Sequence, residues 1–175
     1  DGEKNPERME FSSLNGVRDF LKHLNGQYVI KYDGLMGGKG VKISGEHLHS
    51  IEESLSYAKH IVDGGGTFLI EEKFIGEEFS LMSFCDGTYC AHMPAVQDHK
   101  RAFEGDVGPN TGGMGTYSFA DHSLPFLSKE DIVAAQKTNE RVAAELYKKT
   151  GEKFRGILYG GFMLTGDGVK VIEYN

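Results

Sequence analysis

Two lysines beside a run of glycines could together bind a chain of phosphates. Lys31 stands inside an apolar run, and Lys39 follows eight residues later within Gly37-Gly38-Lys39-Gly40. Glycine leaves backbone N–H groups open to phosphate oxygens, and both ammonium groups could reach one polyphosphate. The segment matches neither the P-loop pattern nor the dinucleotide-binding fingerprint. The alternatives are a long hairpin turn for the glycines and a solvent-facing side chain for Lys31.

Acidic residues gather around the turn Phe74-Ile75-Gly76. Two glutamates, including Glu71, precede the turn and two more, including Glu78, follow it. Such a cluster is either a solvated acidic corner or a grip on a nucleotide. In the second case backbone groups of the turn would read the base, and a carboxylate would bind the ribose hydroxyls.

A third candidate site stands at the end of the sequence. Glu173 and Asn175 alternate with Tyr174 on an expected strand, so their side chains share one face. Carboxylate and amide oxygens suit Mg²⁺, which uses few protein ligands together with phosphates. A polar strand face is the alternative.

Residues 96–115 show no periodicity, and a loop of this length inside a compact domain is usually functional. Its first part, Gln97-Asp98-His99-Lys100-Arg101, places three potential cations beside a carboxylate. Its second part, residues 108–115 (GPNTGGMG), offers many free backbone donors. Together the two parts could bind a phosphorylated substrate. A surface loop is the alternative.

The elements that must position these residues mix helices with antiparallel hairpins, which favours an α+β fold over a parallel sheet. Residues 1–10 are polar, and we expect them to be loose. Ser12 or Ser13 could cap the first helix. Apolar spacing predicts helices over 14–24, 49–62 and 129–150, and strands over 27–32, 41–44, 67–73, 78–84, 88–93, 158–164 and 169–174.

Composition narrows the class of protein. The chain has 175 residues with a formal net charge of −7, so it lacks the basic field that attracts nucleic acid or anionic membranes. Its apolar runs are too short to span a bilayer. Cys85 and Cys90 flank an expected turn at Asp86-Gly87, and we interpret them as structural thiols in a cytoplasmic protein. Because the sequence begins at Asp1 and stops on an expected strand, we expect a piece of a longer protein.

These motifs in this order resemble one enzyme family. The strings VIKYDGLMGGKGV, LIEEKFIGEEFSL, QDHKR, GPNTGGMG and VIEYN are similar to those of the glycinamide ribonucleotide synthetases (phosphoribosylamine–glycine ligases), and QDHKR with GPNTGGMG is the most specific pair. The resemblance covers about Phe11 to Asn175. It implies an ATP-grasp fold in which two α+β subdomains clamp ATP. Residues 1–27 would be an entry segment with a helix, 28–73 the small lid subdomain and 74–175 part of the larger one, with the family's N- and C-terminal domains absent.

The resemblance also implies an activity and roles for residues. The family ligates glycine to 5-phosphoribosylamine through glycyl phosphate and forms ADP, in de novo purine biosynthesis, with Mg²⁺ or Mn²⁺. The implied partners are therefore ATP, glycine, 5-phosphoribosylamine and the rest of the parent chain. By the resemblance, the ATP phosphates are bound by the catalytic cations Lys31 and Lys39 together with Gly37, Gly38 and Gly40. The adenine would contact Glu71, Phe74 and Met163, the ribose would contact Glu78, and the metal ligands would be Glu173 and Asn175. The residues implied near glycine and phosphoribosylamine are Asp98, His99, Lys100, Arg101, Asn110, Thr111, Gly112, Gly113 and Met114.

The sequence departs from the wider pattern at one position. Many ATP-grasp enzymes carry an acidic metal ligand about twelve residues before the position of Glu173, and here that residue is Gly161. Two alternatives remain open. The chain could belong to another ATP-grasp carboxylate–amine ligase, or it could be an inactive nucleotide-binding fragment.

Overall fold

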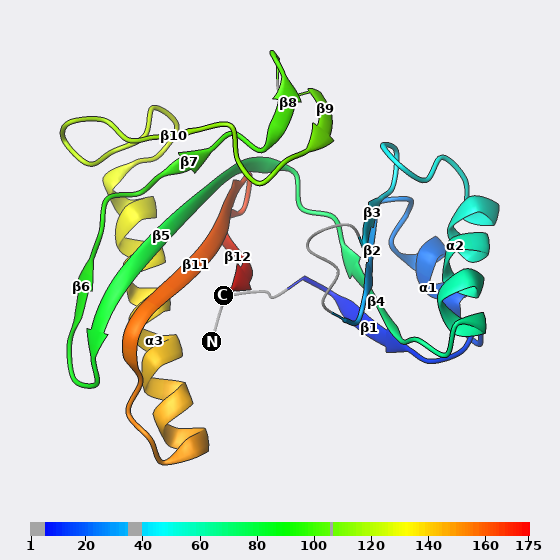
Figure 1. Cartoon of the computed structure of the whole chain (residues 1–175), viewed down its shortest axis with the longest axis horizontal. Helices are drawn as coiled ribbons and strands as arrows, with labels where there is room; N and C mark the ends of the chain where they lie inside the picture. The colour runs from blue at the N-terminus through cyan, green and yellow to red at the C-terminus, as the bar shows by residue number, and fades with distance from the viewer. Residues whose placement is uncertain (1–5, 35–39, 106) are drawn as a thin grey trace. The chain divides into compact units, whose positions relative to one another are not determined.

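The computed structural model describes residues 6–34, 40–105 and 107–175, except for the side chain of Asn110. The chain divides into two compact units. The N-terminal unit runs from Asp1 to Phe74 and the C-terminal unit from Ile75 to Asn175. Each unit has its own sheet and its own helices (Figure 1). The roles of lid and larger subdomain remain predictions.

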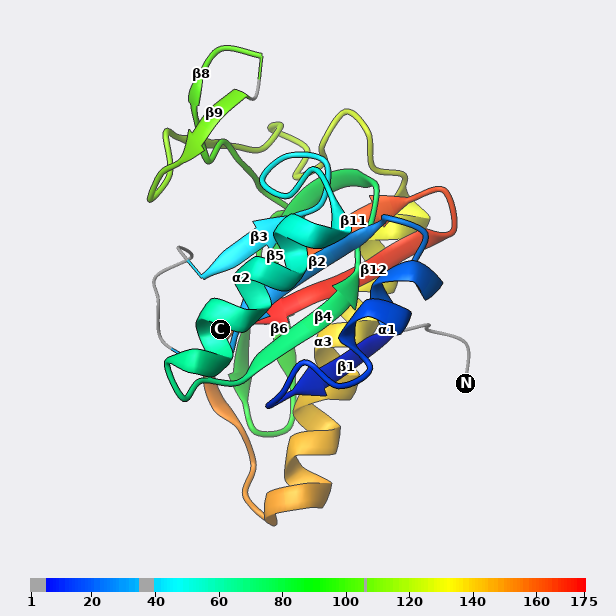
Figure 2. The same ribbon diagram turned by 90° about the vertical axis from the view of Figure 1, so that its right-hand side faces the viewer.

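The N-terminal unit is a four-stranded antiparallel sheet covered on one face by two helices (Figures 1 and 2). The strands lie in the order β1-β4-β2-β3. Ser50 begins the second helix by accepting a hydrogen bond from the Glu53 N–H through its side chain. The bounds are β1 Arg8–Phe11, α1 Val17–His23, β2 Tyr28–Tyr32, β3 Val41–Ile43, α2 Ile51–Asp63 and β4 Phe68–Glu72.

Alternation along the two central strands separates the core from the open face of this sheet. Ile30 and Ile70 are opposite each other in the register, and both are fully buried beneath the helices. The neighbouring residues Lys31 and Glu71 therefore point to the face without helices. This parity decides which side chains can meet a ligand.

Two expectations for the N-terminal unit were wrong. Residues 1–10 were expected to be loose, but Arg8–Phe11 forms β1 and pairs with β4, where the Phe11 ring stacks on Phe68 at 5.5 Å. The first helix begins at Val17, later than expected, with Gly16 as its N-cap and no side-chain cap from either serine. In both cases tertiary packing overrides weak local signals.

The C-terminal unit is a second four-stranded antiparallel sheet, ordered β12-β11-β5-β6, with a long helix on one face (Figure 1). Ser128 and Asp131 form a capping box at the start of the helix, and Gly151 ends it with φ at 75°. The main elements are β5 Gly76–Asp86, β6 Cys90–His92, α3 Lys129–Thr150, β11 Arg155–Thr165 and β12 Gly168–Tyr174.

The long loop is more ordered than its sequence suggested. It contains the β8–β9 hairpin, and its strand β7 pairs with β10 just after the loop, so the expectation of a segment without secondary structure was wrong. The hairpin of β8 and β9 projects away from the main sheet (Figures 1 and 2). These strands have only two to four residues, too few to give a periodic signal. Their bounds are β7 Gln97–Asp98, β8 Arg101–Phe103, β9 Val107–Asn110 and β10 Thr116–Tyr117.

The two cysteines face each other across the β5–β6 hairpin. They are paired in the register, both are buried, and their sulfur atoms lie 3.0 Å apart as free thiols. Burial, followed by the hydrogen bond and charge of Cys90, raises the pKa of the Cys85 thiol to about 12. A thiol held in its protonated form is a poor nucleophile, which agrees with a structural role.

Among the described residues, no helix is long and apolar enough to cross a membrane.

Candidate functional site

The open face of the N-terminal sheet carries a close ion pair. The Lys31 Nζ lies 2.6 Å from a carboxylate oxygen of Glu71, and only 30% and 12% of the two side chains are exposed. Lys31 is opposite Leu69 and Glu71 is opposite Val29, so the pair is diagonal across β2 and β4. The structure thus brings together two residues that the sequence assigned to ATP, and it gives Lys31 an anionic partner within the chain.

The glycine segment is described only at its end. Gly37, Gly38 and Lys39 lie outside the described residues. Gly40 is buried, and its carbonyl oxygen accepts hydrogen bonds from the Tyr32 N–H at 3.0 Å and the Tyr57 hydroxyl at 3.1 Å. These bonds fix the chain where it enters β3. The phosphate-binding role of the preceding residues remains a prediction.

The open face of the C-terminal sheet gathers several residues assigned from the sequence. Glu78 on β5 is directly opposite Met163 on β11, and Gly161 on β11 is opposite Glu173 on β12. Glu78 and Glu173 both line one pocket, together with Ser80, Asp98, Lys100, Tyr159, Gly161 and neighbouring residues. The residues assigned to the ribose, to the substrates and to the metal therefore line one pocket within this unit.

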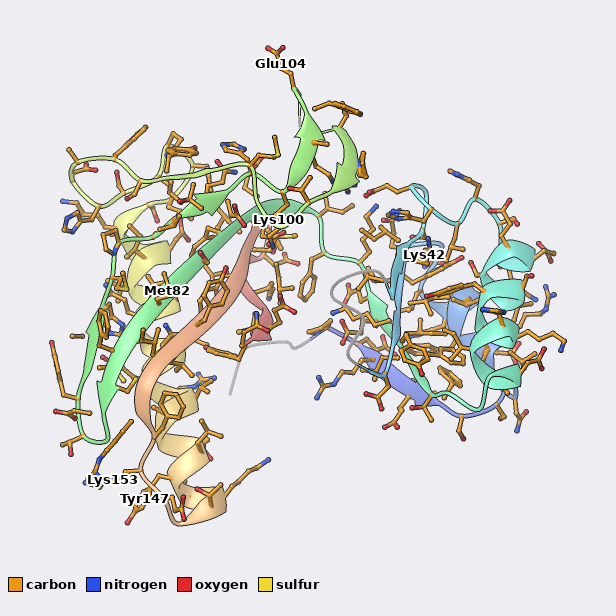
Figure 3. The ribbon with its side chains drawn as sticks, viewed as in Figure 1. Lys42, Met82, Lys100, Glu104, Tyr147 and Lys153 are labelled. Atoms are coloured by element: carbon orange, nitrogen blue, oxygen red, sulfur yellow. The ribbon has the colours of Figure 1, made fainter. Side chains whose placement is uncertain are left out.

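Lys100 reaches this pocket from the long loop. Its ammonium group forms an ion pair with Glu78, and Figure 3 places it at the end of the sheet opposite to Tyr147 and Lys153. Burial lowers the pKa of Lys100, but the hydrogen bond and charge of Glu78, together with the charges of Tyr159 and Asp98, outweigh that effect and raise the pKa above its usual value. Lys100 therefore remains a cation in the pocket at neutral pH.

The two halves of the long loop are tied to each other. The Thr111 N–H and hydroxyl both donate to the Lys100 carbonyl, at 2.7 and 3.0 Å. The Met114 N–H donates to the His99 carbonyl at 2.7 Å, and the His99 ring stacks on Tyr117. The structure thus places side by side two groups that the sequence joined only by hypothesis.

Further contacts complete this arrangement. Arg101 is paired with Asn110 in the register and donates from Nη1 to the Gly108 carbonyl at 3.0 Å. Gly113 has φ at 118°, and a Cβ there would lie 3.3 Å from the Asp98 carboxylate. Gly113 therefore suits a position where the backbone approaches that carboxylate, while the Met114 side chain is exposed.

The last strand presents oxygen atoms that suit a hard cation. The side chains of Glu173 and Asn175 are exposed and close enough for the Asn175 amide to reach a Glu173 carboxylate oxygen at 3.4 Å. No group of three acidic, histidine or cysteine side chains forms a metal cluster in the part of the chain that the structure describes. A pair of oxygen donors fits Mg²⁺ only when phosphates complete the shell.

Other residues of the acidic corner have ordinary partners. Glu72 accepts a hydrogen bond from the Glu7 N–H, and Glu77 accepts one from the Gln97 amide, both at 3.4 Å. Phe74 is the last residue of the N-terminal unit, and its proposed contact with a base remains untested. A separate cavity of about 370 Å³ between the β5–β6 turn and α3 contains none of the residues assigned from the sequence.

One family matches residues 3–175, nearly the whole chain: "Phosphoribosylglycinamide synthetase, ATP-grasp (A) domain". The chain belongs to the phosphoribosylglycinamide synthetase family. The resemblance drawn from the motifs is therefore confirmed, and so is the ATP-grasp fold.

Relatives of this synthetase chain agree with the assignment. It is 51% identical over 169 residues to the phosphoribosylamine–glycine ligase of Methanobrevibacter smithii, covering 94% of this chain and 38% of the relative. It is 46% identical to that of Methanosarcina barkeri, covering 97% and 39%. The crystal structure of the Thermotoga maritima ligase matches with a TM-score of 0.79 at 32% identity, over 99% of this chain and 44% of that one. The chain thus spans about two fifths of the length of these relatives.

The sequence did not single out every residue of the synthetase pocket. Tyr159 and Ser80 line it beside the predicted residues. The alternation of strand β11 carried a usable signal, because Tyr159, Gly161 and Met163 must share one face. Ser80 could have been found in the same way from Glu78. Ser80 lies within the string LIEEKFIGEEFSL but was given no role there, and Tyr159 lies outside the quoted motifs, so the strand parity was the usable signal for both.

Proposed function

We propose that the parent protein of this chain joins glycine to 5-phosphoribosylamine with ATP, giving glycinamide ribonucleotide, ADP and phosphate. The family match over residues 3–175 carries this proposal. The pocket that unites Glu78, Lys100 and Glu173 supports it, because nucleotide, substrate and metal must meet for such a ligation. Since this chain spans only part of its relatives, the activity belongs to the longer protein, with the remaining domains as partners of this chain.

ATP is assigned to residues of both units. Lys31, Lys39 and the backbone of Gly37, Gly38 and Gly40 would contact the phosphates. Glu71, the backbone of Phe74 and Met163 would contact the adenine, and Glu78 the ribose hydroxyls. Met163 lies directly opposite Glu78 on the neighbouring strand. This position supports the assignment of Met163 to the adenine and of Glu78 to the ribose, because base and ribose are adjacent in one nucleotide.

A divalent cation, Mg²⁺ or Mn²⁺, is assigned to Glu173 and Asn175. When bound with ATP, such an ion would neutralise phosphate charge. The two side chains supply the oxygen donors that this ion prefers, and Gly161 opposite Glu173 adds no side chain to the site.

The chemistry requires activation of a carboxylate. Glycine's carboxylate is a poor electrophile, and its phosphorylation by ATP gives glycyl phosphate, which the amine of phosphoribosylamine attacks with loss of phosphate. The protein acts mainly by positioning and by neutralising charge. Lys31 and the protonated Lys100 supply positive charge, and the joined segments Asp98–Arg101 and Asn110–Met114 would hold glycine and phosphoribosylamine. We place the reaction in the cytoplasm.

Product formation by the parent protein tests the proposal. Phosphoribosylamine generated in situ from ribose 5-phosphate and ammonia should give ADP release that requires glycine, and Lys100→Met should reduce it at least tenfold. ADP release with another carboxylate in place of glycine would favour a different ATP-grasp ligase. ATP binding without turnover of any carboxylate would favour a nucleotide-binding module.

A further inference from the structure

A fully buried asparagine on the helix of the C-terminal unit bridges two strands that are not neighbours. Asn139 on α3 donates from its side-chain amide to the Leu81 carbonyl at 3.0 Å and to the Ser83 hydroxyl at 2.8 Å. Its amide oxygen accepts a hydrogen bond from the Tyr174 hydroxyl at 2.8 Å. The bridge therefore joins β5 to β12 across β11, and it satisfies both ends of the buried amide.

The strand between them leaves room for this bridge. Leu81, Gly160 and Tyr174 form one row across β5, β11 and β12. A Cβ at Gly160 would lie 2.7 Å from the Asn139 amide oxygen, which is closer than a side chain tolerates. The missing side chain at Gly160 is thus a condition for the contact between Asn139 and Tyr174.

The bridge continues to the surface through two more side chains. The Ser83 hydroxyl lies 2.8 Å from Nδ1 of His92, and Nε2 of His92 lies 3.3 Å from the Glu140 carboxylate. Because the Ser83 oxygen already accepts from Asn139, its own proton suits Nδ1, which leaves a proton on Nε2 for Glu140. Because the Leu81 carbonyl can only accept, the amide nitrogen of Asn139 faces it and the amide oxygen faces Tyr174.

Tyr174 stands between the two residues assigned to the metal. Its ring packs edge-on against Phe162 at 6.3 Å, on the helix side of the sheet. Alternation then places Glu173 and Asn175 on the opposite, open side. The ladder between β11 and β12 is interrupted by a register shift between Gly161 and Phe162 and resumes with Glu173 and Tyr174, so the bonded end of β12 is short.

We propose that Asn139 is a positioning residue that acts through Tyr174. By holding the tyrosine hydroxyl, it fixes the end of β12 so that Glu173 and Asn175 present their oxygens to the divalent cation. Groups that orient metal ligands commonly change metal affinity by about 10- to 100-fold when removed. The inference rests on the metal assignment in the proposed function.

Mn²⁺ binding by the parent protein tests this role directly. Free Mn²⁺ would be measured by electron paramagnetic resonance in the presence of a non-hydrolysable ATP analogue. Tyr174→Phe removes only the hydroxyl and keeps the packed ring, so that variant should fold, and its dissociation constant for Mn²⁺ should rise about tenfold. Asn139→Leu should raise it at least as much. In turnover assays, the KM for Mg²⁺ should rise while kcat at saturating Mg²⁺ is largely retained.

Tyr28→Phe is the matched control. It removes a buried tyrosine hydroxyl that bonds Ser54 at 2.6 Å, and both residues belong to the N-terminal unit. It should leave Mn²⁺ affinity within about twofold, as expected for a group that does not orient a ligand. Unchanged Mn²⁺ affinity in Tyr174→Phe, with weaker binding in Glu173→Gln, would overturn the positioning role alone. Equal binding by Glu173→Gln and wild type would show that the metal assignment itself is wrong, and the inference would fall with it.

Discussion

At the scale of single residues, the ion pair of Lys31 with Glu71 bears on both the stability of the sheet and the proposed chemistry. The side chain of Lys31 is only 30% exposed and that of Glu71 only 12%, and each charge compensates the other on the open face of the sheet. A partly buried charge without a partner is costly, and the pairing satisfies both groups without a ligand. An incoming phosphate would add a second anion beside Lys31, which a cation of this kind can accommodate.

Replacement of Lys31 by alanine in the parent protein should therefore reduce ligation strongly. Loss of one positioned charge at a developing anion typically costs about 10²- to 10³-fold in rate. Steady-state phosphate release measures the effect. Lys59→Ala is the control, because Lys59 is exposed and pairs with Asp63 one helical turn away. Near-normal turnover in the Lys31 variant would remove this residue from the reaction.

Asp86 gives a prediction about pH. Its carboxylate accepts hydrogen bonds from the Tyr89 and Thr88 N–H groups in the β5–β6 turn, and these bonds hold its pKa below the ordinary value of 3.8. A depressed pKa means that the ionised group stabilises the fold above pH 3.8 and that this contribution is lost as the pH falls through the lower folded-state pKa.

The Asp86 carboxyl carbon should accordingly titrate below pH 3.8 when followed by NMR. The variant Asp86→Asn keeps an oxygen acceptor but does not titrate. Its urea midpoint should fall less than that of the wild type as the pH drops below about 4. Titration of Asp86 at or above its ordinary pKa would contradict the role of the two backbone bonds.

At the scale of elements, the C-terminal sheet depends on close contact between α3 and β11. Gly160 lies beneath the helix, where a Cβ would meet the Phe162 ring at 2.6 Å and Asn139 at 2.7 Å. Both neighbours are fully buried and cannot move aside easily. The glycine is therefore required by packing, with no need for an unusual backbone angle.

Gly160→Ala should lower the free energy of unfolding by about 1–3 kcal/mol, the usual cost of overfilling a packed core. Gly166→Ala in the β11–β12 turn is the control, since no atom lies within 4 Å of its added Cβ. Urea denaturation of this chain measures both variants. Equal stability of the two would mean that the sheet and helix separate more readily than their contacts indicate.

At the scale of the whole molecule, each of the two units packs around its own buried residues. One cluster gathers around Ile30, Phe68 and Ile70 in the N-terminal unit. Another gathers around Phe79, Leu81 and Phe162 in the C-terminal unit, where a smaller cluster includes Leu158. The residues that we propose to contact ATP belong to both units, so each core would support its own share of those proposed contacts.

Each core should respond to its own substitution. Truncation of a buried isoleucine or phenylalanine to alanine costs about 2–5 kcal/mol. Hydrogen exchange followed by mass spectrometry should show faster exchange mainly within residues 6–74 for Ile30→Ala and mainly within 75–175 for Phe162→Ala. A uniform increase along the chain in either variant would show that the two units unfold as one.

Local patterns were enough to identify the principal elements. The alternation around Ile30 and in Leu158–Leu164 predicted strands, and the helical spacing in 49–62 and 129–150 predicted α2 and α3. The order of the motifs also pointed to the family. Such signals are available to sequence reasoning because residues that are neighbours on a helix face or a strand face lie within a few positions of each other.

The sequence by itself therefore determined the α+β class, the main helices and hairpins, the family and the types of residue available for chemistry. Tertiary structure decided which of these residues come into contact. Lys31 pairs with Glu71, Lys100 with Glu78, and Asn139 holds Tyr174, each across 22 to 40 positions of sequence. β1 likewise exists only through its pairing with β4. Strand order, register and helix packing set these contacts, and no local propensity encodes them because the partners become neighbours only when the sheets assemble.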